Sequence, residues 1–488
     1  MTSHDADDQA VPERRRPLIR RLADNLVIAL FFAPVMLAAL PMGASRDWAW
    51  APIAIMIGLA AVLVAAGFGA GRGFEVGERE RRPLLVLIGC FVFFVAFALF
   101  QGASFAPASG STWLYASALR ILGSAHAAVP DIAVDTARNG LLKCIACGLV
   151  FVMARAICRD RGHARLLLAL LVASAVLVVA YALIMQVTTH SCYLGSYLKK
   201  QGLYDPRGQC LMSGTFVNSN SFACYVGMGV VAAMALAFTD RRRERSAFDG
   251  RDVQTFESMM TVTRVTLLVA IFFLLGGLLM SASRAGVAAS VAGALALALL
   301  LMRGQWDERP DLVRWFWVAA AIVFVVGVIA GGALLTKSVR AGDGGSRLII
   351  WMTSLDAIGL SPWLGWGLGS FGDIYTILQP AKIVQPNDLA HSTPLETMVE
   401  LGVIAAIPAF AVVLLPWGLS LRAAFRREYH YRILPAAAFS VAAVPILHSM
   451  VDFSLQIPAI GFVTSAVLGM GWAQAFDRRR SQRRSATV

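Results

Sequence analysis

Long apolar stretches recur along the whole chain, and they constrain its fold more than any other feature of the sequence. Each is long enough for a helix to cross a bilayer core of about 30 Å. A chain of 488 residues that is 58% hydrophobic and 15% charged is too apolar for a soluble domain. The short alternating strands of a membrane β-barrel are absent from this pattern. We therefore predict an all-α, polytopic transmembrane protein.

Hydropathy predicts about 12 spans. The first span is too long for a cleavable signal, and no small-residue cleavage site follows it before the second span. The spans lie near 23–42, 48–69, 84–102, 139–157, 166–187, 219–239, 265–281, 286–302, 315–335, 397–420, 433–450 and 458–476.

The basic residues indicate the orientation of these spans. With the N-terminus in the cytoplasm, the inner segments hold 31 of the 43 Lys and Arg residues, so the positive-inside rule places both termini in the cytoplasm. This rule also explains the net charge of +13, and no nucleic-acid motif accompanies the charge. The sizeable outer loops are then 103–138, 188–218 and 336–396, and function is expected on their side.

Three arginines on this outer side are candidates for binding or catalysis. Arg284 lies in SASRAG, at the tip of a hairpin between two apolar runs, where a charge is costly. Arg340 and Arg347 lie in the loop 336–396, which we expect to carry short helices, one of them beginning at Arg347 and ending before Pro362. A guanidinium fork matches a phosphate or pyrophosphate, whereas an isolated outer arginine is usually only solvated.

Further candidates are a histidine, two asparagines and a His–Asp pair. A histidine can take a proton from a hydroxyl, so His391 is a candidate base, but it is equally compatible with a helix start. Asn218 and Asn220 stand at the entry to a span, either as helix caps or with an amide facing a polar substrate. His448 and Asp452 lie at the outer end of the eleventh span, as a structural pair or as part of the same cavity.

The cysteines and glycines favour no metal or nucleotide site. Cys192 and Cys210 share an outer loop, so a disulfide is allowed, but two free thiols fit the spacing equally well. Cys144 and Cys147 form a CxxC inside a span, where two small buried residues are the better interpretation. GWGLGSFG supplies tight turns and lacks the βαβ unit of a dinucleotide site.

Five blocks of the sequence resemble the superfamily of O-antigen ligases and O-antigen polymerases of bacterial inner membranes. The blocks are GTFVNSNSFACYVGM at 214–228, SASRAGVAAS at 281–290, GSRLIIWMTSLDAIGLSPWLGWGLGSF at 345–371, AHSTPLETMVELGVI at 390–404 and HSMVDFSLQIPAI at 448–460. The fifth is found in part of the family. The first 200 residues match only in hydropathy.

The resemblance implies a glycosyltransferase C-type fold and an inverting, metal-independent reaction without a cofactor. A glycan would pass from undecaprenyl-pyrophosphate to an acceptor hydroxyl at the periplasmic face. The acceptor is lipid A–core in the ligases and another lipid-linked glycan in the polymerases. By motif, the family's functional residues fall on Arg284, Arg347, Arg340 and His391. Ser392 departs from the Asn or Asp that often follows this histidine.

The chain then divides into a basic cytoplasmic tail (1–22), an N-terminal transmembrane region (23–200), a ligase-like region that includes the outer loop (201–476) and a second basic tail (477–488). A 12-span secondary transporter is the rival interpretation. The long outer loop and the lack of a visible repeat count against it. The sequence does not separate ligase from polymerase, and it leaves the sugar, the linkage and the oligomeric state open.

Overall fold

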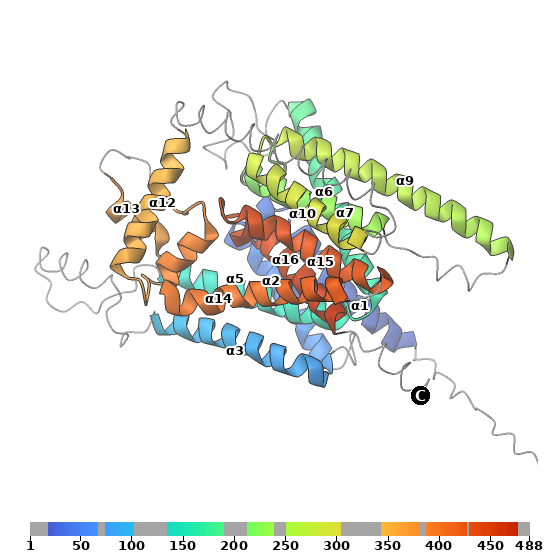
Figure 1. Ribbon diagram of the computed structural model, residues 1–488, viewed down its shortest axis with the longest axis horizontal. Coiled ribbons are helices and arrows are strands. Elements are labelled where there is room, and N and C mark those ends of the chain that lie inside the picture. Colours follow the sequence, from blue (N-terminus) through green and yellow to red (C-terminus); the bar gives the residue numbers. More distant parts are fainter. Residues whose placement is uncertain are drawn as a thin grey trace, which may run out of the picture.

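The structure is a computed structural model. It describes residues 18–66, 74–101, 134–189, 212–238, 250–303, 343–380, 387–426 and 429–476. These residues form helices and connections without a β-strand, as predicted (Figure 1). The elements are α1 (Leu18–Leu37), η1 (Met42–Ala44), α2 (Asp47–Ala65), α3 (Glu78–Gln101), α5 (Val134–Ile157), α6 (Arg161–Thr189), α7 (Ser219–Ala237), α9 (Gly250–Met280), α10 (Arg284–Met302), α12 (Asp343–Leu360), α13 (Phe371–Leu378), α14 (Thr393–Arg426), α15 (Tyr429–His448), η4 (Ser454–Gln456) and α16 (Pro458–Ala475).

Nine of the described helices are long and apolar enough to cross a membrane, which confirms the polytopic helical class. They correspond to nine of the predicted spans. The first predicted span holds a shorter apolar helix, Asn25–Leu37, and the last corresponds to α16. The predicted span 315–335 lies outside the described residues. A total of 12 spans and the cytoplasmic placement of both termini stay predictions.

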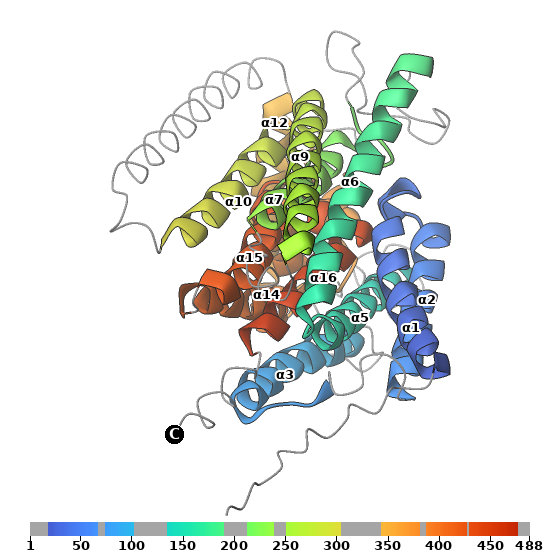
Figure 2. The same cartoon turned by 90° about the vertical axis from the view of Figure 1, so that its right-hand side faces the viewer.

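Helices α7 and α16 form the interior of the bundle: most residues of α7 and nearly all of α16 are buried. α16 packs against α5, α14 and α15, while α1 and α2 lie together at one edge (Figure 2). Small residues allow this packing, because a Cβ at Gly469 would come within 2.5 Å of the Phe151 carbonyl oxygen. Cys147 likewise lies against Gly461, and it is half-buried rather than fully buried as predicted.

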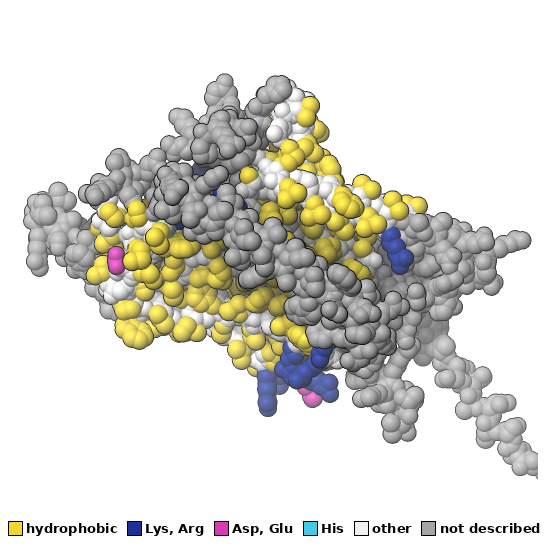
Figure 3. Space-filling model, turned by 45° about the horizontal axis from the view of Figure 1, so that its top comes forward, with side chains coloured by type: hydrophobic (Ala, Val, Ile, Leu, Met, Phe, Trp, Pro, Cys, Tyr) yellow, Lys and Arg dark blue, Asp and Glu magenta, His cyan; other side chains and the backbone are white. Residues whose placement is uncertain are grey.

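The outer helices α3 and α9 expose many large apolar side chains. Hydrophobic side chains cover much of the described surface in Figure 3, and Lys and Arg gather in a few places on it. A soluble protein rarely exposes so large an apolar surface, so this surface is suited to lipid. Burial inside the bundle and exposure around it are the arrangement expected of a helical membrane protein.

A buried ionic network joins α3, α5 and α16. Oε1 of Glu80 accepts hydrogen bonds from Arg155 Nε at 2.7 Å and from Trp472 Nε1 at 2.9 Å. Oε2 accepts one from Arg159 Nη2 at 2.7 Å. Glu80 and Arg155 are almost fully buried, so each charge depends on the others for compensation. The network therefore holds α3 against the bundle.

Helix α14 is broken near its start, at Gly402, whose φ of 63° and ψ of 177° are not helical. The break is bridged by the loop before α13: Trp366 N donates to Val399 O at 3.0 Å, and Val403 N donates to Pro362 O at 2.9 Å. Only glycine fits here, since a Cβ would lie 2.3 Å from the Trp363 carbonyl oxygen. Residues 393–401 are thus set off from the long remainder of the helix.

A small subdomain built from α12 and α13 covers the end of the bundle at this break, and α12 runs across the direction of the long helices (Figure 1). Its core includes Ile350, Trp366, Phe371 and Val399. α12 begins at Asp343, so the predicted start at Arg347 is wrong by one turn, but the helix does end before Pro362. The glycines of GWGLGSFG make the expected turns, with φ of 68°, 111° and 80° at positions 365, 367 and 369.

Candidate functional site

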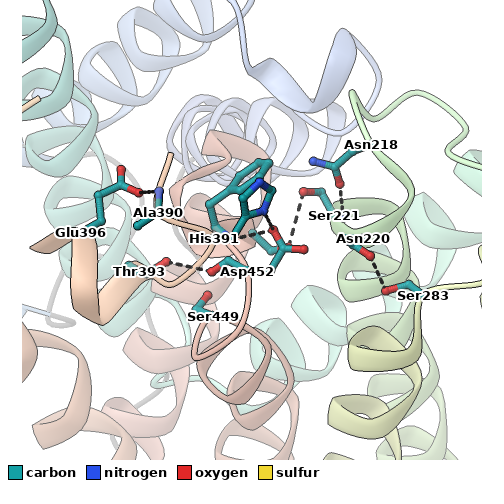
Figure 4. A network of polar contacts seen from close by, with 12 residues as sticks. Asn218, Asn220, Ser221, Ser283, Ala390, His391, Thr393, Glu396, Ser449 and Asp452 are labelled. Atoms are coloured by element: carbon teal, nitrogen blue, oxygen red, sulfur yellow. Dashed lines mark hydrogen bonds and ion pairs between the residues drawn. The ribbon is translucent and has the colours of Figure 1, made fainter. Parts of the chain in front are cut away.

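Most of the predicted site residues gather at one end of the bundle, where three helix starts meet the turn that follows α15 (Figure 4). Three contacts join these segments. Asn220 of α7 bonds to Ser283 before α10, and Ser221 lies 3.4 Å from Ser454, between their hydroxyl oxygens. Thr393 N at the start of α14 donates to Ser449 O at 2.9 Å. Residues far apart in the sequence therefore meet here.

The two asparagines have structural roles at the start of α7. Oδ1 of Asn218 accepts a hydrogen bond from Ser221 N at 2.7 Å, so the N-cap interpretation is confirmed for Asn218. Oδ1 of Asn220 accepts one from Ser283 Oγ at 2.7 Å. Ser283 in turn caps α10, since its Oγ accepts from Gly286 N at 3.2 Å. Asn220 thus fixes the N-termini of α7 and α10 beside each other.

Arg284 is the first residue of α10, and its side chain is exposed. A guanidinium is unfavourable at a helix N-terminus, because the helix dipole is already positive there. Among the described residues no carboxylate forms an ion pair with it. Two adjoining helix N-termini and an arginine together favour a bound anion. The structure thus gives a physical reason for an arginine in SASRAG.

His391 is held in an unusual backbone conformation, with a φ of 50°. The preceding residue, Ala390, is fixed on both sides: its N–H donates to Glu396 Oε2 at 2.8 Å, and its carbonyl accepts from Trp351 Nε1 at 3.1 Å. The imidazole lies against the Phe453 ring, with ring centroids 5.2 Å apart. α14 begins two residues later, at Thr393, so His391 precedes the helix and faces the turn after α15. Strained positions of this kind are frequent at functional sites.

The partner of His391 is Asp452, which is fully buried. Nδ1 of His391 lies 3.9 Å from Oδ1 of Asp452, within ion-pair distance but too far for a hydrogen bond. Burial alone raises the pKa of the Asp452 carboxyl, but His391, His448 and the Phe453 N–H outweigh it and leave that pKa below its usual value. Asp452 is therefore an ionised carboxylate at neutral pH, placed to orient and stabilise a charged imidazole.

His448 ends α15 and is almost fully buried. Arg347 of α12 and Asp452 are both near enough to His448 to interact with it electrostatically. Within the described ranges, no hydrogen-bond partner is present for either ring nitrogen of His448, for Nδ1 of His391 or for Oδ2 of Asp452. Buried polar atoms rarely lack a hydrogen-bond partner. Their concentration in one place indicates a site that binds a polar ligand.

Sequence reasoning missed two buried carboxylates in the first turns of α14. Glu396 fixes Ala390, and Glu400 Oε1 accepts from Phe371 N, at the start of α13, at 3.4 Å. Gln101 of α3 adds a third tie, donating to Leu364 O at 2.6 Å and to Glu400 O at 3.0 Å. The signal was present in LETMVELG, where two glutamates four residues apart share one face of an otherwise apolar helix.

Three predicted positions lie outside the described residues: Arg340, and the cysteines of the proposed disulfide, Cys192 and Cys210. Their predictions stay untested. Of the others, the structure joins His391, His448 and Asp452 in one group, with Arg347 within electrostatic reach of His448. It places Arg284 with Asn220 in a second group, and the contact between Ser221 and Ser454 connects the two.

Comparison with known proteins gives one family. Residues 268–410 match the family described as O-antigen ligase, which confirms the resemblance read from the sequence blocks. The matched range includes Arg284, Arg347 and His391, whereas His448 and Asp452 lie beyond its end. No curated protein matches the chain.

Proposed function

We propose that this chain, a multi-pass membrane protein whose residues 268–410 belong to the O-antigen ligase family, is a glycosyltransferase acting on a lipid-linked glycan. It moves the glycan from undecaprenyl-pyrophosphate to an acceptor hydroxyl at the periplasmic face of the bacterial inner membrane. One observation carries the proposal most: His391 faces the buried carboxylate of Asp452 at the bundle end where both arginines lie.

The donor's diphosphate binds the arginines in this proposal. Arg284 and the adjoining N-termini of α7 and α10 supply positive charge and N–H donors on one side, and Arg347 supplies a second guanidinium. The prenyl tail remains in lipid. As the sugar leaves, negative charge grows on the bridging phosphate oxygen, and these groups stabilise it. The arginines thus do the electrostatic work that a metal ion does in other transferases.

His391 acts on the acceptor. The acceptor oxygen forms a bond to the anomeric carbon while the bond from that carbon to the phosphate oxygen breaks. This inverts the anomeric centre and releases undecaprenyl-pyrophosphate. His391 orients the acceptor hydroxyl and takes its proton, and the carboxylate of Asp452 stabilises the resulting imidazolium. His448 and the free Oδ2 of Asp452 are available for hydrogen bonds to acceptor hydroxyls.

The test is a transfer assay in purified membranes with undecaprenyl-pyrophosphate-linked glycan, with and without lipid A–core. Wild type is compared with Arg284→Ala, His391→Ala and the control Arg46→Ala, which removes an exposed arginine from the start of α2. We expect Arg284→Ala to lose about 10²–10³ in rate, by analogy with a lost oxyanion donor. The control keeps its activity.

The products also distinguish the acceptors. Glycan on lipid A–core identifies a ligase, and a ladder of longer carrier-linked glycans without lipid A–core identifies a polymerase. Near-full transfer by Arg284→Ala at normal expression contradicts the assignment of this residue. No glycan movement at all, with a donor that the organism makes, contradicts the proposed function and returns attention to a transporter.

A further inference from the structure

Helix α12 carries an apolar stripe that no described part of the chain covers. Leu348, Met352 and Leu355 lie on one face of it and are 60%, 55% and 50% exposed. Trp363, which follows the helix, is 65% exposed. Scattered exposed apolar residues are ordinary, but three along one helix face, continued by an exposed tryptophan just after the helix, are not.

The exposure of this stripe does not come from loose packing. The opposite face of α12 holds Ile350 and Ala357, which are buried with Trp366 and Val399 in the core of the outer subdomain. Hydrogen bonds lock the same face, since Trp366 Nε1 donates to Ala357 O at 2.8 Å. α12 is therefore firmly docked through one apolar face and presents a second apolar face outward.

The outward stripe continues into the surface of a membrane-spanning helix. The carbonyl oxygen of Trp363 accepts from Ile404 N at 3.4 Å, just after the break in α14. On α14, Ile404 and Ile407 are 41% and 63% exposed, as expected of a span that faces lipid. The end of the α12 stripe is thus attached to the point where the lipid-facing part of α14 begins.

The direction of α12 fits the same surroundings. The long helices run along one direction in Figure 1, and α12 runs across it at their ends. If those helices cross the bilayer, α12 lies in the plane of the membrane. Asp356 is exposed beside the stripe, and a carboxylate there stays in the headgroup layer and limits how deep the helix sinks. An exposed tryptophan is typical of that same layer.

We propose that α12 and Trp363 form an in-plane membrane anchor, whose stripe of Leu348, Met352, Leu355 and Trp363 contacts lipid acyl chains of the outer leaflet. The outer leaflet follows from the predicted orientation of the chain. The anchor does not depend on the reaction. Its consequence rests on the proposed function: Arg347, in the first turns of α12, is held at the depth of lipid phosphates, where the diphosphate of a membrane-embedded donor also lies.

The anchor is tested by photo-crosslinking in proteoliposomes of phosphatidylethanolamine and phosphatidylglycerol, with no glycan donor or acceptor present. A benzophenone amino acid replaces Met352 or, in separate proteins, Leu355. The lipid-facing Ile407 serves as the positive control, and the exposed Asp388 serves as the negative control. Adducts are identified by mass spectrometry, and each variant is first checked for monodisperse elution. Leu348 replaces any position whose variant fails to fold.

Phospholipid adducts at Met352 and Leu355, comparable in yield with those at Ile407 and well above Asp388, support the anchor. A crosslinked dimer from either position shows that a second copy covers the stripe and overturns the proposal. Adducts at Ile407 alone show that the stripe faces water and overturn it as well. Because neither substrate is present, these outcomes do not depend on whether the chain transfers a glycan.

Discussion

Replacing Asp452 by asparagine tests the central pair of the proposed site. The side chain keeps its size and loses its charge, 3.9 Å from the nearest nitrogen of His391. At an effective dielectric constant of about 20, a full charge pair at this distance is worth about 4 kcal/mol. His391 is 27% exposed and only partly charged in the transition state, so we expect about 2–4 kcal/mol, or a rate loss of about 30- to 1000-fold.

The assay is glycan transfer in purified membranes under saturating donor. Asp373→Asn serves as the matched control, because it neutralises an exposed carboxylate of the same outer subdomain. Thermal unfolding in detergent shows whether both variants fold. If Asp452→Asn folds and stays within about threefold of wild type, which is below 1 kcal/mol, while His391→Ala is inactive, the carboxylate does not support the histidine and our reasoning fails.

Three further predictions concern stability. Gly402→Ala forces a Cβ to within 2.3 Å of a carbonyl oxygen, in a backbone conformation that costs about 1–3 kcal/mol. It should lower both the melting temperature and the rate of glycan transfer, whereas Gly418→Ala, in open space on the same helix, should change neither. Equal melting curves for the two variants would contradict this. Glu80→Ala leaves two arginines unpaired and should lower the free energy of chemical unfolding by about 3 kcal/mol. Glu78→Ala, at an exposed position, should lower it by almost nothing. Similar losses for the two variants would refute the stabilising role of the network. The pKa of Asp452 is lower in the folded protein, so its stabilising effect is present above about pH 4 and is lost as pH falls through the folded pKa. The difference in melting temperature between wild type and Asp452→Asn should therefore narrow only in acid. A difference that narrows near neutrality would count against an ionised Asp452.

The spans could be predicted because length and apolarity suffice for that purpose. α7 was expected at 219–239 and occupies Ser219–Ala237, and the glycines of GWGLGSFG make the turns that were read from them. A local pattern predicts local structure, since it rests on the same few neighbouring residues.

Pairings across the bundle were not available to such reasoning. His391 and Asp452 are 61 residues apart, and they meet because Thr393 bonds to the turn after α15. Glu80 and Trp472 are 392 positions apart, so the residues around Glu80 in the sequence give no sign of this contact. The break in α14 was also missed: Gly402 looks like an ordinary small residue until the loop before α13 lies against it.

The central place of α16 has a consequence for how the chain is made. It is the last described helix to leave the ribosome, yet it is buried on nearly every side, between α5, α14 and α15. The surfaces of the earlier helices that pack against α16 therefore stay uncovered in the membrane until α16 inserts between them. Asp452 and His448 come just before it, so the candidate site is complete only after α16 has entered the bundle. A nascent chain would be inactive until then, and open to quality-control proteases during that interval.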